Sequence, residues 1–131
     1  MNRPTWDDTF AEIAEVMSRR STCSRRQVGA VLVKDNRIVA SGYNGSPPGV
    51  PHCVDGACPR GRLSYDEVPA GADYNAYPCI ACHAELNAII RAGHDRANGG
   101  TLYVTDKPCQ QCWNAILAAG IKVVRWPDME V

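Results

Sequence analysis

Hydrophobic residues recur at helical spacing near the start of the chain. Four large apolar side chains follow one another at intervals of four, three and four residues: Trp6, Phe10, Ile13 and Met17. Thr5 and Asp8 stand just before this series and resemble a helix capping box. The pattern predicts an amphipathic helix over residues 5–20, with its apolar stripe turned toward a core.

A different pattern, typical of strands, follows this helix. The segments QVGAVLV and RIVASGY are rich in β-branched residues and lie on either side of the turn-like KDN. This arrangement predicts two adjacent strands joined as a hairpin. From Asn44 to Pro78 the chain is dense in Gly, Pro, Asp and Cys and has no periodicity, which predicts a long loop.

Regular patterning returns in the second half of the chain. A helix is predicted from Cys82 to Ala92, closed by Gly93, and a second one from Pro108 to a point before Gly120. The strand-like segments TLYVT and KVVRW follow these helices, and the terminal DMEV is a candidate for a short further strand.

The predicted order of elements is α-β-β-α-β-α-β. Because strands alternate with helices in the second half, we expect parallel pairing there and helices on both faces of one sheet. The fold class is therefore α/β, a three-layer α/β/α sandwich with a mixed sheet of four to five strands. At 131 residues the chain fits one domain, residues 1–131.

Charge and cysteine content narrow the classes of function. The chain has 14 basic and 14 acidic residues, so we expect a small ligand rather than long nucleic acid. There is no charged-then-apolar leader, and no apolar run approaches the roughly 20 residues of a membrane span, so we expect a soluble, cytoplasmic protein. Seven cysteines in a reducing compartment favour metal binding or chemistry over disulfides.

The segment KPCQQC carries the clearest chemical signal. It places Cys109 and Cys112 in the first turn of a predicted helix, after Pro108 at the favoured first helical position. A helix N-terminus favours the thiolate, which is the form that binds zinc. Alone, the pair could equally be a redox dithiol, half of a four-cysteine zinc site, or two buried cysteines.

His83 favours a zinc site among these alternatives for the cysteine pair. It begins the other predicted helix, and helices that follow strands of the same sheet can converge at its carboxyl edge. His83, Cys109 and Cys112 would make three ligands with a fourth position open, which is typical of catalytic zinc. Glu85 follows two residues later and points elsewhere on the helix, so we expect it to act as an acid and base beside the metal. Taken separately, these residues could be ordinary capping and first-turn groups.

The combination H-x-E followed by P-C-x-x-C is the signature of zinc nucleobase deaminases. The segments RRQVGAVLV, ASGYNGSPPGVPHC, CHAELNAII and YVTDKPCQQCWNAILAAGIK resemble the deoxycytidylate (dCMP) deaminase branch of the cytidine deaminase superfamily. The resemblance implies that Asn44 contacts the sugar of a nucleotide and that the backbone around Ala84 positions the pyrimidine. Read from the residues alone, Asn44 and Gly45 form a turn, which is compatible with such a role.

The expected reaction is hydrolytic deamination of a cytosine nucleotide, dCMP to dUMP and ammonia. Water activated at zinc would attack C4 of the ring, while Glu85 protonates N3 and then the departing amine. Arg25 and Arg26 are candidates for holding the phosphate. The alternative is that the basic run SRRSTCSRR, to which they belong, is a solvated helix end. The resemblance also implies a homo-oligomer, a dimer or hexamer, and regulation by deoxynucleoside triphosphates.

The remaining cysteines suggest a second, structural zinc site. The spacing in HCVDGAC is close to that of structural zinc ligands, and Cys23, Cys53, Cys58 and Cys79 are its candidate ligands, with His52 as a substitute. The alternatives are that these are small buried apolar residues or thiols that are free by accident. We expect Cys82, next to His83, to pack against the core.

Three other functions share parts of this pattern. A deaminase of another base, such as free or modified cytosine, guanine or adenosine in RNA, would keep the zinc centre and change the pocket. A non-enzymatic zinc-stabilised module would share the cysteines but would not need Glu85. A thiol redox protein would use Cys109 and Cys112 without metal.

Overall fold

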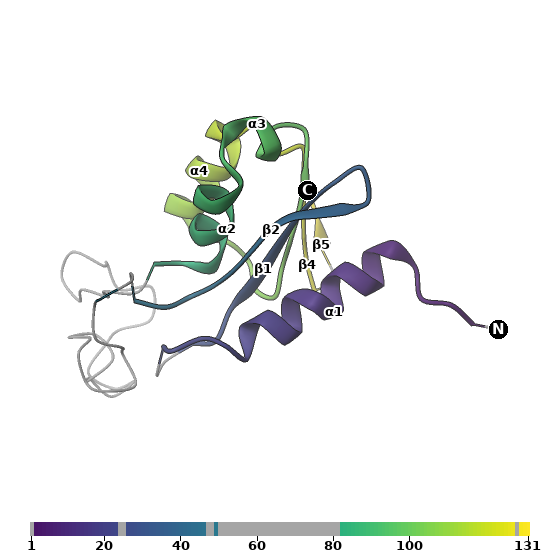
Figure 1. The fold of residues 1–131 in the computed structure, drawn as a ribbon, viewed down its shortest axis with the longest axis horizontal. Helices are drawn as coiled ribbons and strands as arrows, with labels where there is room; N and C mark the ends of the chain where they lie inside the picture. Colours follow the sequence, from purple (N-terminus) through teal and green to yellow (C-terminus); the bar gives the residue numbers. More distant parts are fainter. Residues whose placement is uncertain (1, 24–25, 47–48, 50–81, 128) are drawn as a thin grey trace.

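The protein folds around a mixed β-sheet, seen in a computed structural model that describes residues 2–23, 26–46, 49, 82–127 and 129–131 (Figure 1). The strands are β1 (Gly29–Lys34), β2 (Arg37–Tyr43), β3 (Thr101–Val104), β4 (Val123–Trp126) and β5 (Met129–Glu130). The helices are α1 (Trp6–Ser18), α2 (Ala84–Ala92), α3 (His94–Ala97) and α4 (Gln110–Ala118). Among the described residues, none of these helices has the length and apolar character that crossing a membrane requires.

The strand order in the sheet is β2-β1-β3-β4-β5. β1 pairs antiparallel with β2 and with β3, β3 pairs parallel with β4, and β5 closes the edge antiparallel to β4. Asp35 and Asn36 at the hairpin tip have positive φ values of 54° and 58°, as a two-residue turn between twisted strands requires. The predicted hairpin, the parallel pairing and the terminal strand are confirmed.

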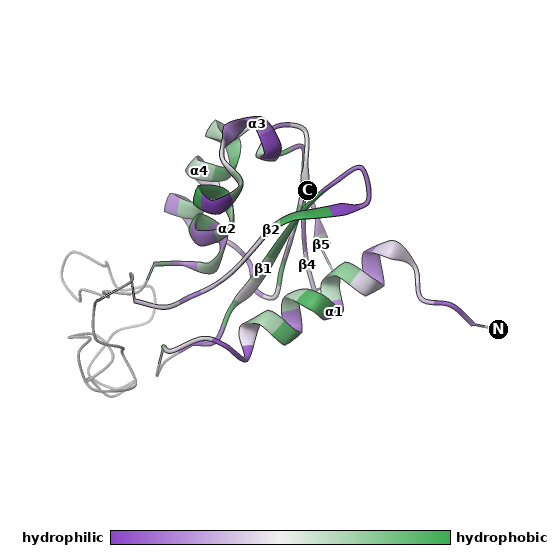
Figure 2. Ribbon diagram, viewed as in Figure 1, coloured by the Kyte–Doolittle hydropathy of each residue, from purple (hydrophilic) through white to green (hydrophobic). Residues whose placement is uncertain are grey.

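Helices cover both faces of the sheet (Figure 1). α1 packs on one face against β1 and β3, while α2 packs on the other face and contacts α4. β1 is buried on both sides, because Ala30 and Leu32 join the core under α2 and α4 while Val31 and Val33 join the core under α1. Figure 2 shows this strand as apolar and the hairpin tip as polar. The predicted three-layer α/β/α sandwich is confirmed.

The helix starts differ from the sequence prediction in a way that matters for the site. α2 begins at Ala84 with His83 as its N-cap, and α4 begins at Gln110 with Cys109 as its N-cap. The prediction that Pro108 is the first helical residue was wrong, because Cys109 is still extended, with φ −73° and ψ 170°. The short α3, which follows Gly93 at a φ of 75°, was not predicted.

Two glycines let the helices approach the sheet closely. A Cβ on Gly42 would collide with the Ala84 carbonyl oxygen and lie 2.8 Å from the Ala88 nitrogen, in the first turns of α2. A Cβ on Gly29 would collide with the Ala14 carbonyl oxygen in α1. Because only hydrogen fits at Gly42, the N-terminus of α2 can lie directly against β2.

Candidate metal and catalytic site

The N-termini of α2 and α4 converge on one face of the sheet. The chain reaches α2 through a pair of backbone hydrogen bonds between Gly45 and Cys82, and it reaches α4 from the end of β3. His83 and Cys109 are the two N-cap residues, and Cys112 lies in the first turn of α4. Since α2 packs against α4, three potential ligands from distant parts of the chain meet.

The three side chains have the geometry of a metal site. His83 Nδ1 lies 3.2 Å from Cys112 Sγ and 3.5 Å from Cys109 Sγ, and all three ligand atoms lie within 4.8 Å of one another. Zinc bonds of about 2.0–2.1 Å to nitrogen and about 2.3 Å to sulfur, at a tetrahedral angle, would separate those atoms by roughly 3.5 Å. The donor set and its spacing therefore fit zinc.

Burial strongly affects the ionisation of the Cys112 thiol. The side chain is completely buried, and burial raises the pKa of its thiol far above the ordinary value, with Glu85 and Cys109 raising it further. The expectation that the helix N-terminus alone would favour the thiolate is therefore wrong for Cys112 without metal. A cation is needed to stabilise the thiolate there, so zinc binding would release a proton.

Glu85 lies against the three ligands without joining them. Its side chain is only 4% exposed, and its carboxyl forms a hydrogen bond with Cys112. Burial raises the pKa of the Glu85 carboxyl above its ordinary value, and its own backbone amide, His83, Cys112 and Arg26 oppose that rise. A buried carboxyl that gains a proton more readily than usual is suited to moving protons.

Asn44 lies just before the Gly45–Cys82 pair and is almost fully buried. Its Oδ1 accepts a hydrogen bond of 2.9 Å from the Val28 amide, and its Nδ2 donates one of 2.7 Å to the Arg26 carbonyl. This side chain thus fixes the entry into β1. Ala84, the first residue of α2, is completely buried.

Only one of the two arginines expected near phosphate can be described. Arg25 falls outside the described residues. Arg26 Nη2 lies 2.6 Å from Asp106 Oδ2, in an ion pair whose side chains are 57% and 52% exposed. Asp106 precedes the Cys109 segment, so this pair borders the site.

Most of the candidate second zinc site also falls outside the described residues, namely His52, Cys53, Cys58 and Cys79. Cys23 is described and is 7% exposed. No disulfide joins the cysteines that the structure describes. Cys82 is half-buried, and burial raises the pKa of its thiol, with Glu85 adding to the rise and Arg91 opposing it.

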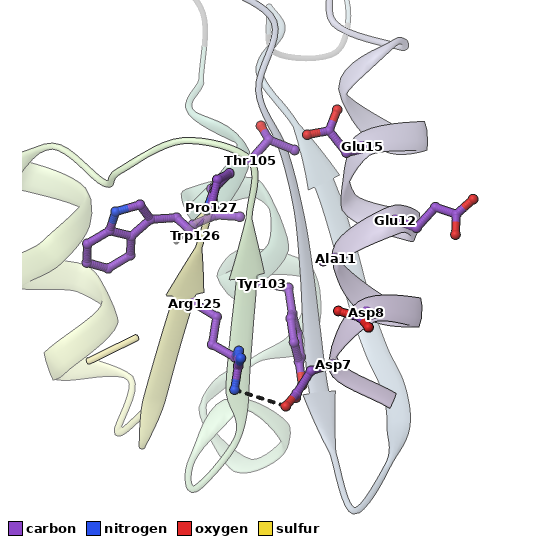
Figure 3. A pocket seen from close by; sticks show the side chains of 11 residues that line it. Asp7, Asp8, Ala11, Glu12, Glu15, Tyr103, Thr105, Arg125, Trp126 and Pro127 are labelled. Atoms are coloured by element: carbon purple, nitrogen blue, oxygen red, sulfur yellow. Dashed lines mark hydrogen bonds and ion pairs between the residues drawn. The ribbon is translucent and has the colours of Figure 1, made fainter. Parts of the chain in front are cut away.

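A groove of about 410 Å³ lies elsewhere, between α1 and the ends of β3 and β4 (Figure 3). Asp7 is its central group: it accepts a hydrogen bond of 2.5 Å from the Tyr103 hydroxyl and pairs with Arg125 at 2.9 Å. Burial raises the pKa of Tyr103, and the bond to Asp7 adds to the rise. None of the site residues predicted from sequence lines this groove.

Two residues near the site were missed by sequence reasoning. Asn87 Nδ2 donates to the carbonyls of Tyr43 and Cys82, at 2.8 and 3.3 Å, and Asp106 holds Arg26. For Asn87 a signal existed, because it stands four residues after His83 and therefore on the same side of α2. No local pattern pointed to Asp106, which pairs with a residue far away in the sequence.

Comparison with known proteins gives consistent matches. The family model for the cytidine and deoxycytidylate deaminase zinc-binding region matches residues 4–126. The chain is 47% identical over 129 residues to a deoxycytidylate deaminase of Mycobacterium phage D29, covering 97% of this chain and 98% of that protein. It is 42% identical over 123 residues to the deoxycytidylate deaminase of Schizosaccharomyces pombe, covering 93% of this chain but 37% of the yeast protein.

Solved structures give the same result. The dCMP deaminase of cyanophage S-TIM5, solved in complex with dCMP and dUMP, aligns with a TM-score of 0.70 and 29% identity. The alignment covers 96% of this chain and 83% of that one. A tRNA:A34 deaminase aligns less well, with a TM-score of 0.56 and 27% identity.

Proposed function

The chain belongs to the cytidine and deoxycytidylate deaminase family and is a zinc-dependent enzyme that deaminates dCMP to dUMP and ammonia, and we propose the part that each residue takes in that reaction. The observation that carries the proposal is the meeting of His83, Cys109 and Cys112 beside the buried Glu85. We also propose that residues 1–131 act as a single deaminase domain.

His83, Cys109 and Cys112 hold the zinc through Nδ1 and two thiolates. When bound, zinc lowers the pKa of a water molecule toward about 7 and so supplies a nucleophile at neutral pH. The protein fixes these ligands at two helix N-termini, where partial positive charge adds to that of the bound cation in stabilising the thiolates. Among the described residues three candidate ligands come together, the number of protein ligands that catalytic zinc sites have, whereas structural zinc sites have four.

Glu85 moves the protons. It transfers one proton from the attacking water to N3 of the cytosine, and a second from the new hydroxyl at C4 to the amine, which leaves as ammonia. Burial supports this role, because a carboxyl with a raised pKa can hold the proton between the two transfers.

Glu85→Gln tests this role. The amide keeps the shape of the side chain but cannot carry the proton, so we expect zinc content to stay at the wild-type level while kcat falls by about 10²- to 10⁴-fold. Turnover that stays near wild type in the zinc-loaded variant would contradict the assignment.

Asn44 and the backbone around Ala84 bind the nucleoside. Among the described residues Asn44 Oδ1 and Nδ2 each form one hydrogen bond, and an amide can form one more at each atom, which would serve the sugar. Ala84 has no bulk beyond Cβ and stands between His83 and Glu85, which lets its backbone approach the pyrimidine.

Arg26, together with Arg25, binds the phosphate. A guanidinium can hold phosphate with two parallel hydrogen bonds, and the exposed guanidinium of Arg26 already donates one hydrogen bond to the Asp106 carboxylate. We expect Arg26→Ala to raise the KM for dCMP about ten-fold and to leave the KM for deoxycytidine unchanged. Equal rises for both substrates would exclude a phosphate role for Arg26.

We propose a second zinc held by Cys23, Cys53, Cys58 and Cys79, with His52 as a substitute ligand. The burial of Cys23 and the cysteine spacing in HCVDGAC support it. Metal analysis of freshly purified protein should give two zinc ions per chain, falling to one in Cys58→Ala with dCMP turnover retained. One zinc per wild-type chain would refute the second site.

The enzyme acts as a homo-oligomer, a dimer or hexamer, in the cytoplasm. Ile90 on α2 and Leu117 on α4, two helices that pack against each other, are 71% and 62% exposed, so this side of the protein offers apolar side chains for a subunit contact. Light scattering should show dissociation in Ile90→Asp but not in Val16→Asp, on the opposite face of the sheet. A monomeric wild type would contradict the proposal. Reduced cysteine ligands suit the cytoplasm.

Deoxynucleoside triphosphates are proposed as effectors on the basis of the resemblance to dCMP deaminases. Titration of each of these nucleotides at a dCMP concentration well below KM should change the rate. A rate unaffected by all of them would exclude this form of regulation.

A further inference from the structure

Asn87 joins two parts of the chain that carry the site. Its side-chain Nδ2 donates to the carbonyl of Tyr43, at the end of β2, at 2.8 Å and to the carbonyl of Cys82, just before His83, at 3.3 Å. Its own backbone amide donates to the His83 carbonyl at 3.0 Å. One residue in α2 thus holds both the strand that leads to Asn44 and the segment that presents His83.

A second set of bonds strengthens this connection. The Gly45 amide donates to the Cys82 carbonyl at 3.1 Å, and the Cys82 amide donates to the Gly45 carbonyl at 2.8 Å. Both neighbours of Asn44 in the chain are therefore hydrogen-bonded to this region. Tyr43 accepts from Asn87 in α2, and Gly45 pairs with Cys82, just before the helix. The side chain of Asn44 itself is held by hydrogen bonds to the Val28 amide and the Arg26 carbonyl.

The chemistry of position 87 is specific. A neutral amide nitrogen carries two hydrogens and can serve two carbonyls at once. A carboxylate at this position would turn lone pairs toward the same carbonyls, and an apolar side chain would leave them without this donor.

We propose that Asn87 is a positioning residue that sets the distance between the nucleoside-binding segment at Asn44 and the metal ligand His83. The proposal rests on the roles given above to Asn44 and His83. When Asn87 is lost, the end of β2 can move away from the start of α2, so bound dCMP is held less well against the zinc. The metal ligands keep their own helix positions.

The test uses Asn87→Ala and Asn87→Asp in the zinc-loaded enzyme, with Asn114→Ala as the matched control. Asn114 is exposed on α4, and its side chain accepts a hydrogen bond from Gln110 alone among the described contacts. We expect zinc content and the absorption spectrum of the cobalt-substituted protein to stay unchanged in all three variants. We expect KM for dCMP to rise about ten-fold in Asn87→Ala, with a smaller fall in kcat per zinc.

Two further readouts separate positioning from simple loss of folded protein. Asn87→Asp should be impaired at least as much as Asn87→Ala, because a carboxylate cannot donate. Hydrogen exchange at the Gly45 and Cys82 amides should become about ten-fold faster in Asn87→Ala, with or without substrate.

Unchanged KM, kcat and exchange in Asn87→Ala would overturn the inference, as would a loss of activity that only follows a loss of zinc. A wild-type enzyme that neither deaminates dCMP nor binds dUMP would overturn the proposed function instead. The exchange measurement would in that case still show whether Asn87 holds the two segments together.

Discussion

His83 Nδ1 and Cys112 Sγ lie 3.2 Å apart although the two residues belong to different helices. His83 is the N-cap residue of α2 and Cys112 lies in the first turn of α4, so a metal site built from them would form only when both helices pack on the same face of the sheet. Zinc binding and correct packing of these helices are therefore linked.

This relationship predicts that Cys112→Ser and Cys82→Ser behave differently. Cys112→Ser removes a ligand, so zinc content and dCMP turnover should both fall to background. Cys82→Ser alters a neighbouring thiol outside the ligand group, so zinc should remain at the wild-type level. Metal analysis after dialysis checks both variants, and loss of zinc in Cys82→Ser alone would contradict the ligand assignment.

The close contact between β2 and α2 predicts that Gly42→Ala is destabilising. The added Cβ meets backbone atoms of Ala84 and Ala88, which cannot move without shifting the N-terminus of α2. We expect a loss of about 1–3 kcal/mol in the free energy of unfolding, together with weaker zinc binding. Ser41→Ala, the adjacent position in β2, should change stability by less than about 0.5 kcal/mol, as measured by urea unfolding.

Asp106 is predicted to compete with the substrate phosphate for Arg26. Asp106→Asn removes the competing charge, and exposed ion pairs contribute only about 0.2–1 kcal/mol, so we expect KM for dCMP to fall by about two- to five-fold. The double variant Arg26→Ala with Asp106→Asn should show no such gain. An equal gain with deoxycytidine would show that the effect does not involve phosphate.

The raised pKa of Tyr103 predicts that the stability of the protein depends on pH in the alkaline range. Burial raises the pKa of Tyr103 above its usual value of 10.0, so the folded protein keeps a proton that the unfolded chain loses at alkaline pH. This contribution to stability is complete below pH 10 and declines as the pH rises beyond it. Tyr103→Phe loses the bond to Asp7, at a cost of about 1 kcal/mol, and its stability should decline less between pH 9 and 11. Parallel declines in the two proteins would contradict this explanation.

Sequence reasoning selected His83, Cys109 and Cys112, whose ligand atoms the structure brings within reach of one metal ion. It could do so because the signal is local: the Pro-Cys-x-x-Cys and His-x-Glu segments each mark a helix N-terminus. It also placed the hairpin and the parallel strands, since β-branched runs and turn residues determine those elements. It misplaced the start of α4 at Pro108, because Cys109 is held extended as the N-cap, with φ −73° and ψ 170°.

The contacts of Asn87 and Asp106 could not be predicted in the same way. Each joins segments far apart in the chain, Asn87 with Tyr43 and Asp106 with Arg26, so they depend on how β2, β3 and α2 come together. The effect of burial on Cys112 was missed for the same reason, since a helix N-terminus can be read from sequence but complete burial of the thiol cannot.

Ammonia release per bound zinc, measured in parallel with cytosine, deoxycytidine, dCMP, dCTP and single-stranded DNA, tests the central claim most directly. The arrangement of His83, Cys109, Cys112 and Glu85, with Arg26 at its border, predicts activity confined to dCMP and absent from Glu85→Gln. Full zinc occupancy with no ammonia released from dCMP, or release from another of these compounds in preference to dCMP, would contradict it.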